Sequence, residues 1–179
     1  MILIRLQIDL FHYSGVWYLH DNNVIHGDIK PQNILLSADK KEVKLCDFGV
    51  SRIKASKQAT LTCAGNFAGT LDSVAPEMLL KSTRSTRATD LWALGCTLVE
   101  LFVQEVAWKM TEAGEQDPKE FLKGLMRAKL LPHNLFQLEL FNRDIFNRVK
   151  ELFEYDPVNR PSAEALCKFF SPSDSDEDN

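Results

Sequence analysis

The chain has 179 residues, of which 45% are hydrophobic and 26% charged, and its formal net charge is −4. This length accommodates one domain, or part of a larger one, with enough residues to bury a core. The acidic balance argues against a nucleic-acid-binding face. The four cysteines include no C-x-x-C pair, which favours neither a zinc site nor a disulfide framework and indicates a reducing, intracellular compartment.

Two apolar stretches resemble membrane or targeting segments but are better explained as helices of a folded domain. Residues 3 to about 21 predict an amphipathic helix, and Arg5 and Asp9 interrupt what would otherwise read as a signal peptide. The stretch "LWALGCTLVELFVQEVAW" contains Glu100 and Glu105 and is shorter than a clean membrane span of about 20 residues. We expect a buried helix there and no membrane contact.

The remaining pattern predicts a hairpin, a long loop and a series of helices. "NILLS" and "EVKLCDF" read as two short strands joined by the polar turn "ADKK". Residues 51–70 are small and polar, and predict a loop long enough to be functional. Helices are predicted over residues 76–81, 88–103, 118–128, 143–153 and 162–169. Residues 171–179, "SPSDSDEDN", predict a solvated acidic tail, so the folded domain is expected to span residues 1–170.

Five short motifs in this order resemble those of eukaryotic-type serine/threonine protein kinases. They are "HGDIKPQN" (26–33), similar to the catalytic loop, "DFG" (47–49), "APE" (75–77), "DLWALG" (90–95) and "NRPSAEAL" (159–166). One tripeptide alone would be a weak signal, but five ordered motifs make coincidence improbable. The resemblance covers roughly residues 3–170. It implies a mainly α fold like the large C-terminal kinase lobe, a helical bundle with a short β-hairpin beside the catalytic loop. An unrelated helical domain is the alternative.

The resemblance assigns roles to four polar residues in and after the opening motif. Asp28 would accept or orient the proton of a substrate hydroxyl, and Lys30 would supply positive charge to the γ-phosphoryl group of ATP. Asn33 and Asp47 would bind Mg²⁺ beside the nucleotide phosphates, through hard oxygen ligands, and the hairpin would bring these two together. Taken singly, each of these residues except Lys30 could instead only cap or form a turn.

The same resemblance places three further residues around the nucleotide and the substrate. Thr70 would hydrogen-bond near Asp28 and Lys30, a feature of the serine/threonine branch. Leu35 would contact the nucleotide. Ser73 stands where many family members have an aromatic residue, so the pocket for the residue after the phosphoacceptor is expected to differ. Protein substrates with serine or threonine hydroxyls are therefore implied, without a peptide preference.

Other motif residues are expected to act structurally rather than chemically. His26 and Phe48 should pack against each other to organise the site. Glu77 (of "APE") and Arg160 (of "NRPSAEAL") resemble the partners of a buried ion pair, and Asp90 should hold the catalytic-loop backbone by hydrogen bonds. Cys46 is expected to be a small buried core residue.

Gly27 departs from the family pattern, because most members have an arginine there that grips a phosphate on the activation loop. Without that guanidinium, a phosphate on Thr60 or Thr62 lacks its bidentate partner, so activity need not depend on it. Arg52 or Lys54 could instead capture the phosphate. Drift in a degenerate copy is another explanation of the glycine.

The sequence contains no G-x-G-x-x-G and no V-A-I-K, the motifs by which kinases cover and grip the nucleotide phosphates. The N-terminal β-rich lobe that carries them is expected to be missing from these 179 residues. Two hypotheses follow: the catalytic half of a serine/threonine kinase, inactive alone, or a non-catalytic kinase-fold binding module. In either case the surface that would face the absent lobe is a candidate site for a partner protein.

Overall fold

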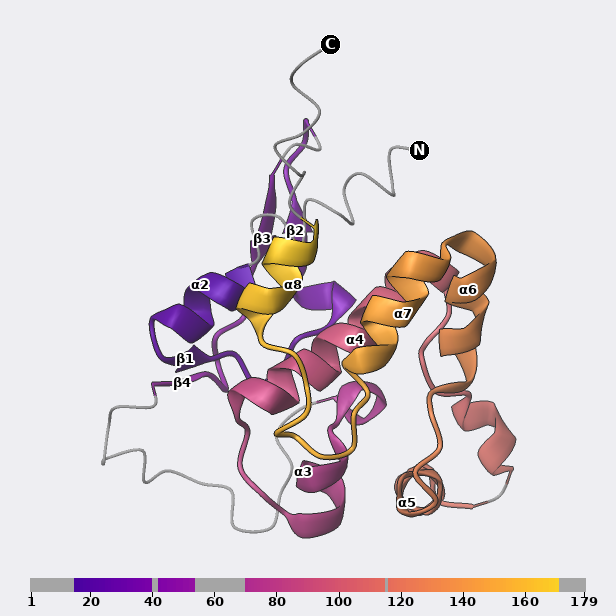
Figure 1. Cartoon of the computed structure of the whole chain (residues 1–179). Helices are drawn as coiled ribbons and strands as arrows, with labels where there is room; N and C mark the ends of the chain where they lie inside the picture. Colours follow the sequence, from indigo (N-terminus) through magenta and orange to yellow (C-terminus); the bar gives the residue numbers. More distant parts are fainter. Residues whose placement is uncertain (1–14, 40–41, 54–69, 115, 171–179) are drawn as a thin grey trace.

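Helices make up most of the part of the chain that the computed structural model describes, residues 15–39, 42–53, 70–114 and 116–170 (Figure 1). The mainly α fold predicted from the sequence is therefore confirmed. The α-helices are α2 (Gly15–Asp21), α3 (Pro76–Lys81), α4 (Arg87–Val103), α5 (Pro118–Arg127), α6 (Leu138–Phe141), α7 (Arg143–Glu151) and α8 (Ala163–Phe170). Short 3₁₀ turns lie at η1 (Pro31–Asn33), η2 (Leu71–Ser73), η3 (Met110–Ala113) and η4 (His133–Gln137).

The strands form two small antiparallel pairs. Strands β2 (Ile34–Leu36) and β3 (Val43–Leu45) make the predicted hairpin, with Ile34 opposite Leu45 and Leu36 opposite Val43. A second pair was not predicted: β1 (Val24–Ile25), just before the catalytic loop, pairs with β4 (Arg52–Ile53). Strands of two residues are too short to show an alternating pattern in the sequence, so only their pairing in the folded structure reveals them.

The loop predicted over residues 51–70 is therefore wrong at its start, where Arg52 and Ile53 form β4, because this segment pairs with β1. Directly after the predicted loop, residues Leu71–Ser73 form the 3₁₀ turn η2. Residues 54–69 lie outside the described residues, as do residues 3–14 of the predicted first helix and the tail at 171–179. The described part of that first helix, Gly15–Asp21, is helical as predicted.

Helix α4 is the central element, and every residue from Thr89 to Val99 is buried. A helix that is buried all round is mostly apolar on every side, which explains the long hydrophobic run seen in the sequence, and the buried polar residues Thr89, Asp90 and Thr97 are hydrogen-bonded. It begins with a capping box between Thr86 and Thr89. A Cβ added at Gly95 would lie 3.0 Å from Cζ of the buried Phe153, so a glycine is required for the close approach of that segment.

Helices α3, α5, α7 and α8 begin and end close to their predicted bounds, for local reasons, whereas the short helix α6 was not predicted. Helices α3 and α5 each have a proline in the first turn, and the side chains of Asp117 and Asn142 cap α5 and α7. Helix α7 stops at Glu151 rather than at residue 153, because Leu152 and Phe153 turn inward to the core. In the described part of the chain, no helix is long and apolar enough to cross a membrane.

Candidate active site

Three polar side chains, brought from two segments 40 residues apart, form one hydrogen-bonded cluster. The Lys30 ammonium lies 2.7 Å from Asp28 Oδ2 and donates to Thr70 Oγ1 at 3.1 Å. The Thr70 hydroxyl in turn donates to Asp28 Oδ1 at 3.0 Å. Asp28 and Lys30 come from the loop after β1, and Thr70 directly precedes η2. We call these three residues the catalytic-loop cluster; the contact of Thr70 with both partners agrees with the sequence-based expectation.

Asn33 fixes the loop that carries this cluster. Its amide nitrogen donates to the backbone carbonyl of Asp28 at 2.8 Å and to Asp28 Oδ2 at 3.3 Å. Asn33 is buried and ends η1, a turn that Pro31 starts in a conformation suited to it. The asparagine therefore braces the Asp28 backbone and carboxylate at once.

The electrostatics of Asp28 favour its ionised form. Burial on its own would raise the pKa of this carboxyl, but the hydrogen bonds from Lys30 and Thr70, with the charge of Lys30, outweigh it and hold the pKa below its usual value. A carboxylate held ionised by neighbouring donors can orient a substrate hydroxyl and accept a hydrogen bond from it.

The buried carboxylate of Asp90, on α4, holds the start of the catalytic loop from below. Oδ2 accepts a hydrogen bond from the backbone N–H of His26, and Oδ1 accepts one from the N–H of Gly27, both at 2.9 Å. His20 Nε2 lies 2.9 Å from the same Oδ2. The expected structural role of Asp90 is visible in these bonds.

His26 is fully buried and packs on Phe48, with ring centroids 5.1 Å apart and planes inclined by 57°. Its Nε2 donates to the carbonyl of Cys46 at 3.1 Å, and its Nδ1 lies 3.3 Å from the Asp28 N–H. Both bonds fit the tautomer with its proton on Nε2. The ring thus packs on Phe48, as the sequence led us to expect, and both of its nitrogens are engaged in holding the loop.

The two candidate magnesium ligands lie on adjacent segments of backbone. The N–H of Cys46, the neighbour of Asp47, donates to the carbonyl of Asn33 at 2.9 Å. Asp47 has a positive φ of 62°, and its Oδ1 accepts the Gly49 N–H at 3.2 Å, so the residue also shapes the turn. Strained backbone of this kind clusters at functional sites.

The donor set of Asn33 and Asp47 fits Mg²⁺ bound together with phosphates. One amide oxygen and one carboxylate are hard ligands, and Mg²⁺ is commonly held by one or two carboxylates plus substrate phosphates rather than by a protein cage. Within the described residues, no group of three or more His, Cys, Asp or Glu side chains is arranged to hold a metal ion.

Gly27 has a φ of +83°, which side chains other than glycine rarely adopt. A Cβ added there would lie 3.3 Å from the carbonyl oxygen of Val50. The glycine thus suits the turn that presents Asp28. Of the two residues that could capture a loop phosphate, Arg52 lies in β4 and Lys54 lies outside the described residues. Thr60 and Thr62, which would carry the phosphate, also lie outside them.

The expected ion pair between Glu77 and Arg160 is present and bidentate. Arg160 Nη1 and Nη2 donate to the two carboxylate oxygens of Glu77 at 2.6 and 2.7 Å. The guanidinium also donates to the carbonyls of Glu154 and Ala88, and it is buried. This pair fastens the start of α3 to the segment before α8.

Above the loop, several apolar side chains are exposed. Leu35 and Leu36 of β2 are 54% and 46% exposed, and Phe48 is 48% exposed. Leu35 is thus accessible for the contact expected of it. Cys46 is only partly buried, which corrects its assignment to the core: as the chain leaves β3 it turns out of the hairpin, and the residue contributes its carbonyl and N–H rather than a packed side chain.

Sequence reasoning missed two residues that support the loop. His20 contacts Asp90 from α2, and the Ser51 hydroxyl donates to the carbonyl of His26 at 3.0 Å. Neither stands in a recognisable motif. They are 70 and 25 residues away from their partners in sequence, so only the folded structure shows that they meet.

The chain is similar to protein kinases over most of its length. The model of the protein kinase domain matches residues 11–170. Cyclin-dependent kinase-like 2 of Homo sapiens is 34% identical over 151 residues, 82% of this chain and 28% of the relative. Mitogen-activated protein kinase kinase kinase 5 of Homo sapiens is 36% identical over 155 residues, 86% of this chain and 10% of the relative.

A third relative, the probable cyclin-dependent kinase 8 of Dictyostelium discoideum, is 42% identical over 109 residues, 59% of this chain and 28% of the relative. The chain thus spans less than about a third of the length of each of these proteins. Its five motifs, its mainly helical fold and the match over residues 11–170 place it in one family. The chain belongs to the eukaryotic-type serine/threonine protein kinases.

Proposed function

We propose that this chain supplies the catalytic loop of a protein kinase that transfers the γ-phosphoryl group of ATP to serine or threonine hydroxyls of protein substrates. The observation that supports this most is the catalytic-loop cluster, in which an ionised Asp28 is bound by Lys30 and Thr70 within 2.7 to 3.1 Å. Such a cluster positions a carboxylate and a cation side by side, as phosphoryl transfer needs.

In this proposal each residue acts by orientation and charge. Asp28 orients the substrate hydroxyl and accepts its proton, while Lys30 offsets negative charge on the transferred group. Thr70, on the segment that ends in "APE", ties the substrate side of the site to Asp28. Asn33 keeps the loop in shape through its two bonds to Asp28.

Mg²⁺ would be held by Asn33 and Asp47 and would neutralise phosphate charge, and Leu35 would contact the nucleotide. Both bonds of Asn33 to Asp28 use its amide nitrogen, which leaves the amide oxygen as the atom suited to the metal. Other proposed features are an intracellular location and a single domain over residues 1–170.

The 179 residues alone are proposed to have negligible kinase activity. They lack the Gly-rich loop and strand lysine that clamp the nucleotide phosphates, and preorganised charge supplies most of the rate of such enzymes. The alternative proposal is a non-catalytic binding module, whose partner protein would cover the exposed leucines of β2. The exposure of Leu35 and Leu36 favours it for the isolated chain.

The decisive experiment measures phosphate transfer to a basic protein substrate by two forms of the protein. The 179-residue chain should transfer no more than its Asp28→Asn variant. A form extended upstream by any in-frame segment that carries a Gly-rich loop and lysine, identified by sequencing the transcript, should be active and should lose about 10²- to 10⁴-fold in kcat upon Asp28→Asn.

Lys44→Met is the matched control, because Lys44 is an exposed lysine that pairs with Glu42 at 3.0 Å on the hairpin. It should leave the rate unchanged, whereas Lys30→Met should lower it. Activity of the short chain above its Asp28→Asn variant would refute the claim of inactivity. An extended form that is inactive although Asp28, Lys30, Asn33 and Asp47 are intact would favour the binding module instead.

A further inference from the structure

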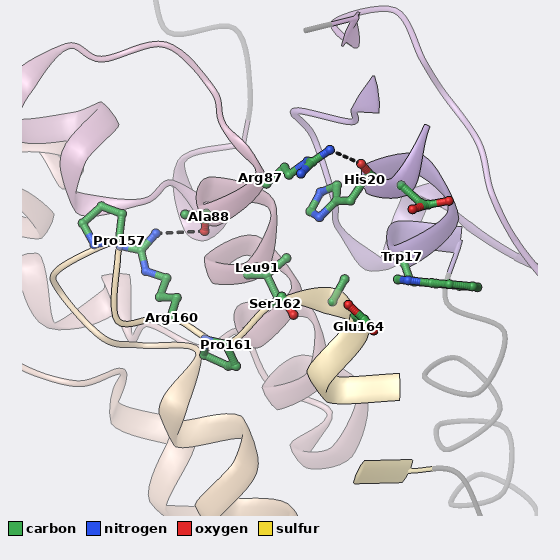
Figure 2. Close-up of a pocket in the computed structure, with 12 residues that line it drawn as sticks. Trp17, His20, Arg87, Ala88, Leu91, Pro157, Arg160, Pro161, Ser162 and Glu164 are labelled. Atoms are coloured by element: carbon green, nitrogen blue, oxygen red, sulfur yellow. Dashed lines mark hydrogen bonds between the residues drawn. The ribbon is translucent and has the colours of Figure 1, made fainter. Parts of the chain in front are cut away.

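A cavity lined by described residues lies away from the catalytic-loop cluster, between α2, the start of α4 and the segment that leads into α8 (Figure 2). Its volume is about 320 Å³, within the range of pockets that bind small molecules. The lining residues are Trp17, His20, Asp21, Arg87, Ala88, Leu91, Pro157, Arg160, Pro161, Ser162, Ala163 and Glu164. None of them belongs to the proposed catalytic, nucleotide or magnesium residues.

Arg87 is a fixed cation whose charge no carboxylate neutralises within the described part of the chain. One of its nitrogens, Nη2, donates to the carbonyl of His20, the dashed line in Figure 2, and to Asn23 Oδ1 at 3.1 Å. Both acceptors are neutral. They hold the guanidinium in place while its Nη1 and Nε protons are left to form charged hydrogen bonds with an anion.

The other charged residues of the lining are mostly neutralised by partners. Arg160 is paired with Glu77, Glu164 with Lys168 at 2.7 Å, and His20 lies against Asp90. Asp21 is the one acidic lining residue without an ion pair among the described residues. A single negative charge therefore suits the cavity better than a phosphate dianion, which Asp21 would repel.

The apolar part of the lining offers flat and rigid surfaces. Trp17 is 44% exposed, whereas Leu91 beneath is almost fully buried. Pro157 and Pro161 lie on the other side of the cavity, with Arg160 between them in the view of Figure 2. An aromatic ring can stack on an indole and pack on proline and leucine at little cost in conformational entropy.

We propose that this cavity is a binding site for a small aromatic monocarboxylate, with its carboxylate on Arg87 and its ring against Trp17 and Leu91. The cavity is connected to the catalytic loop through two side chains. His20 lines the cavity and contacts Asp90, and Asp90 accepts hydrogen bonds from the N–H groups of His26 and Gly27. A bound ligand therefore stabilises the packing beneath the loop that carries Asp28.

Fluorine NMR of para-trifluoromethylbenzoate, titrated with the 179-residue chain, tests this site without interference from protein signals. We expect saturable line broadening with a Kd of about 0.1 to 1 mM, the range for a ligand of this size. The uncharged isostere para-trifluoromethylbenzamide should bind about tenfold more weakly or worse, because it cannot form the charged bond to Arg87.

Arg87→Gln should weaken benzoate binding about tenfold. Arg84→Gln is its matched control, because Arg84 is an exposed arginine three residues earlier that does not line the cavity. Ala88→Leu, which fills the cavity from α4, should abolish binding, and circular dichroism melts will select variants that remain folded. Absence of saturable binding, equal binding of the amide, or equal loss in Arg84→Gln and Arg87→Gln would overturn the proposal.

Discussion

Asp28 shows how a single residue in this chain depends on neighbours far away in sequence. Lys30 and Asn33 lie within five positions, but Thr70 is 42 positions away and donates to the other carboxylate oxygen. The sequence motif explains the first two contacts. The third requires the segment before η2 to return to the catalytic loop.

The lowered pKa of Asp28 predicts how stability depends on pH. A carboxyl whose folded pKa lies below its unfolded value of 3.8 stabilises the fold above that value, and loses this contribution as pH falls through the folded pKa. The free-energy difference of unfolding between the wild type and Asp28→Asn should therefore shrink between about pH 5 and pH 2. Urea unfolding followed by circular dichroism at each pH will measure it.

Lys30→Met should flatten this pH dependence, because the lysine supplies both a hydrogen bond and a charge to Asp28. Lys44→Met, at an exposed pair, serves as the control and should leave it unchanged. An equal effect of both lysine variants would contradict the assignment of the lowered pKa to the cluster.

At the scale of elements, the bidentate bond between Glu77 and Arg160 joins the start of α3 to the segment that precedes α8. The two residues are 83 positions apart. Arg160 also lies over the ring of Trp92, with its Cζ 5.0 Å from the ring centroid, so the same guanidinium contacts α4. Three helices are thus organised around one buried charge pair.

Glu77→Gln should destabilise the protein by about 3–5 kcal/mol, because it leaves the buried Arg160 without its counter-charge. Urea unfolding monitored by tryptophan fluorescence will give the free energy of unfolding. Glu139→Gln is the matched control at the exposed pair with Arg143, 3.9 Å apart, and should cost no more than about 1 kcal/mol. Similar losses in both variants would argue against a structural role for the buried pair.

At the scale of the whole molecule, the exposed apolar side chains Leu35, Leu36 and Phe48 lie on the surface of the hairpin and of the segment just after it. We call it the hairpin surface. Nucleotide and a second lobe would cover it in a complete kinase according to the proposed function. In the described structure these side chains are exposed, and exposed apolar side chains favour association.

The isolated chain should therefore self-associate and bind a hydrophobic dye, and the double variant Leu35→Ser with Leu36→Ser should reduce both effects. Analytical ultracentrifugation over a concentration series will show the change. Leu140→Ser, at a side chain on α6 that is 88% exposed, is the control and should have a smaller effect. A wild-type chain that stays monomeric and does not raise the fluorescence of the dye would contradict this expectation.

The sequence by itself determined the family, the order of the elements and the identities of the polar residues around the catalytic loop. Each of its five motifs is a contiguous run of residues, and the apolar periodicity located the later helices except α6 to within about two residues. It also identified the partners Glu77 and Arg160, through motifs at both ends of the contact. Local patterns suffice wherever a helix or a motif carries its own signal.

The tertiary structure alone decided which distant groups meet. The pairing of β1 with β4, the support of Asp90 by His20 and the cavity around Arg87 leave no local pattern, since each depends on how the chain returns after tens of residues. Cys46 is only partly buried, although its small apolar side chain favours burial. Side-chain type predicts a tendency to be buried, whereas packing around α4 decides which side chains are buried and which meet.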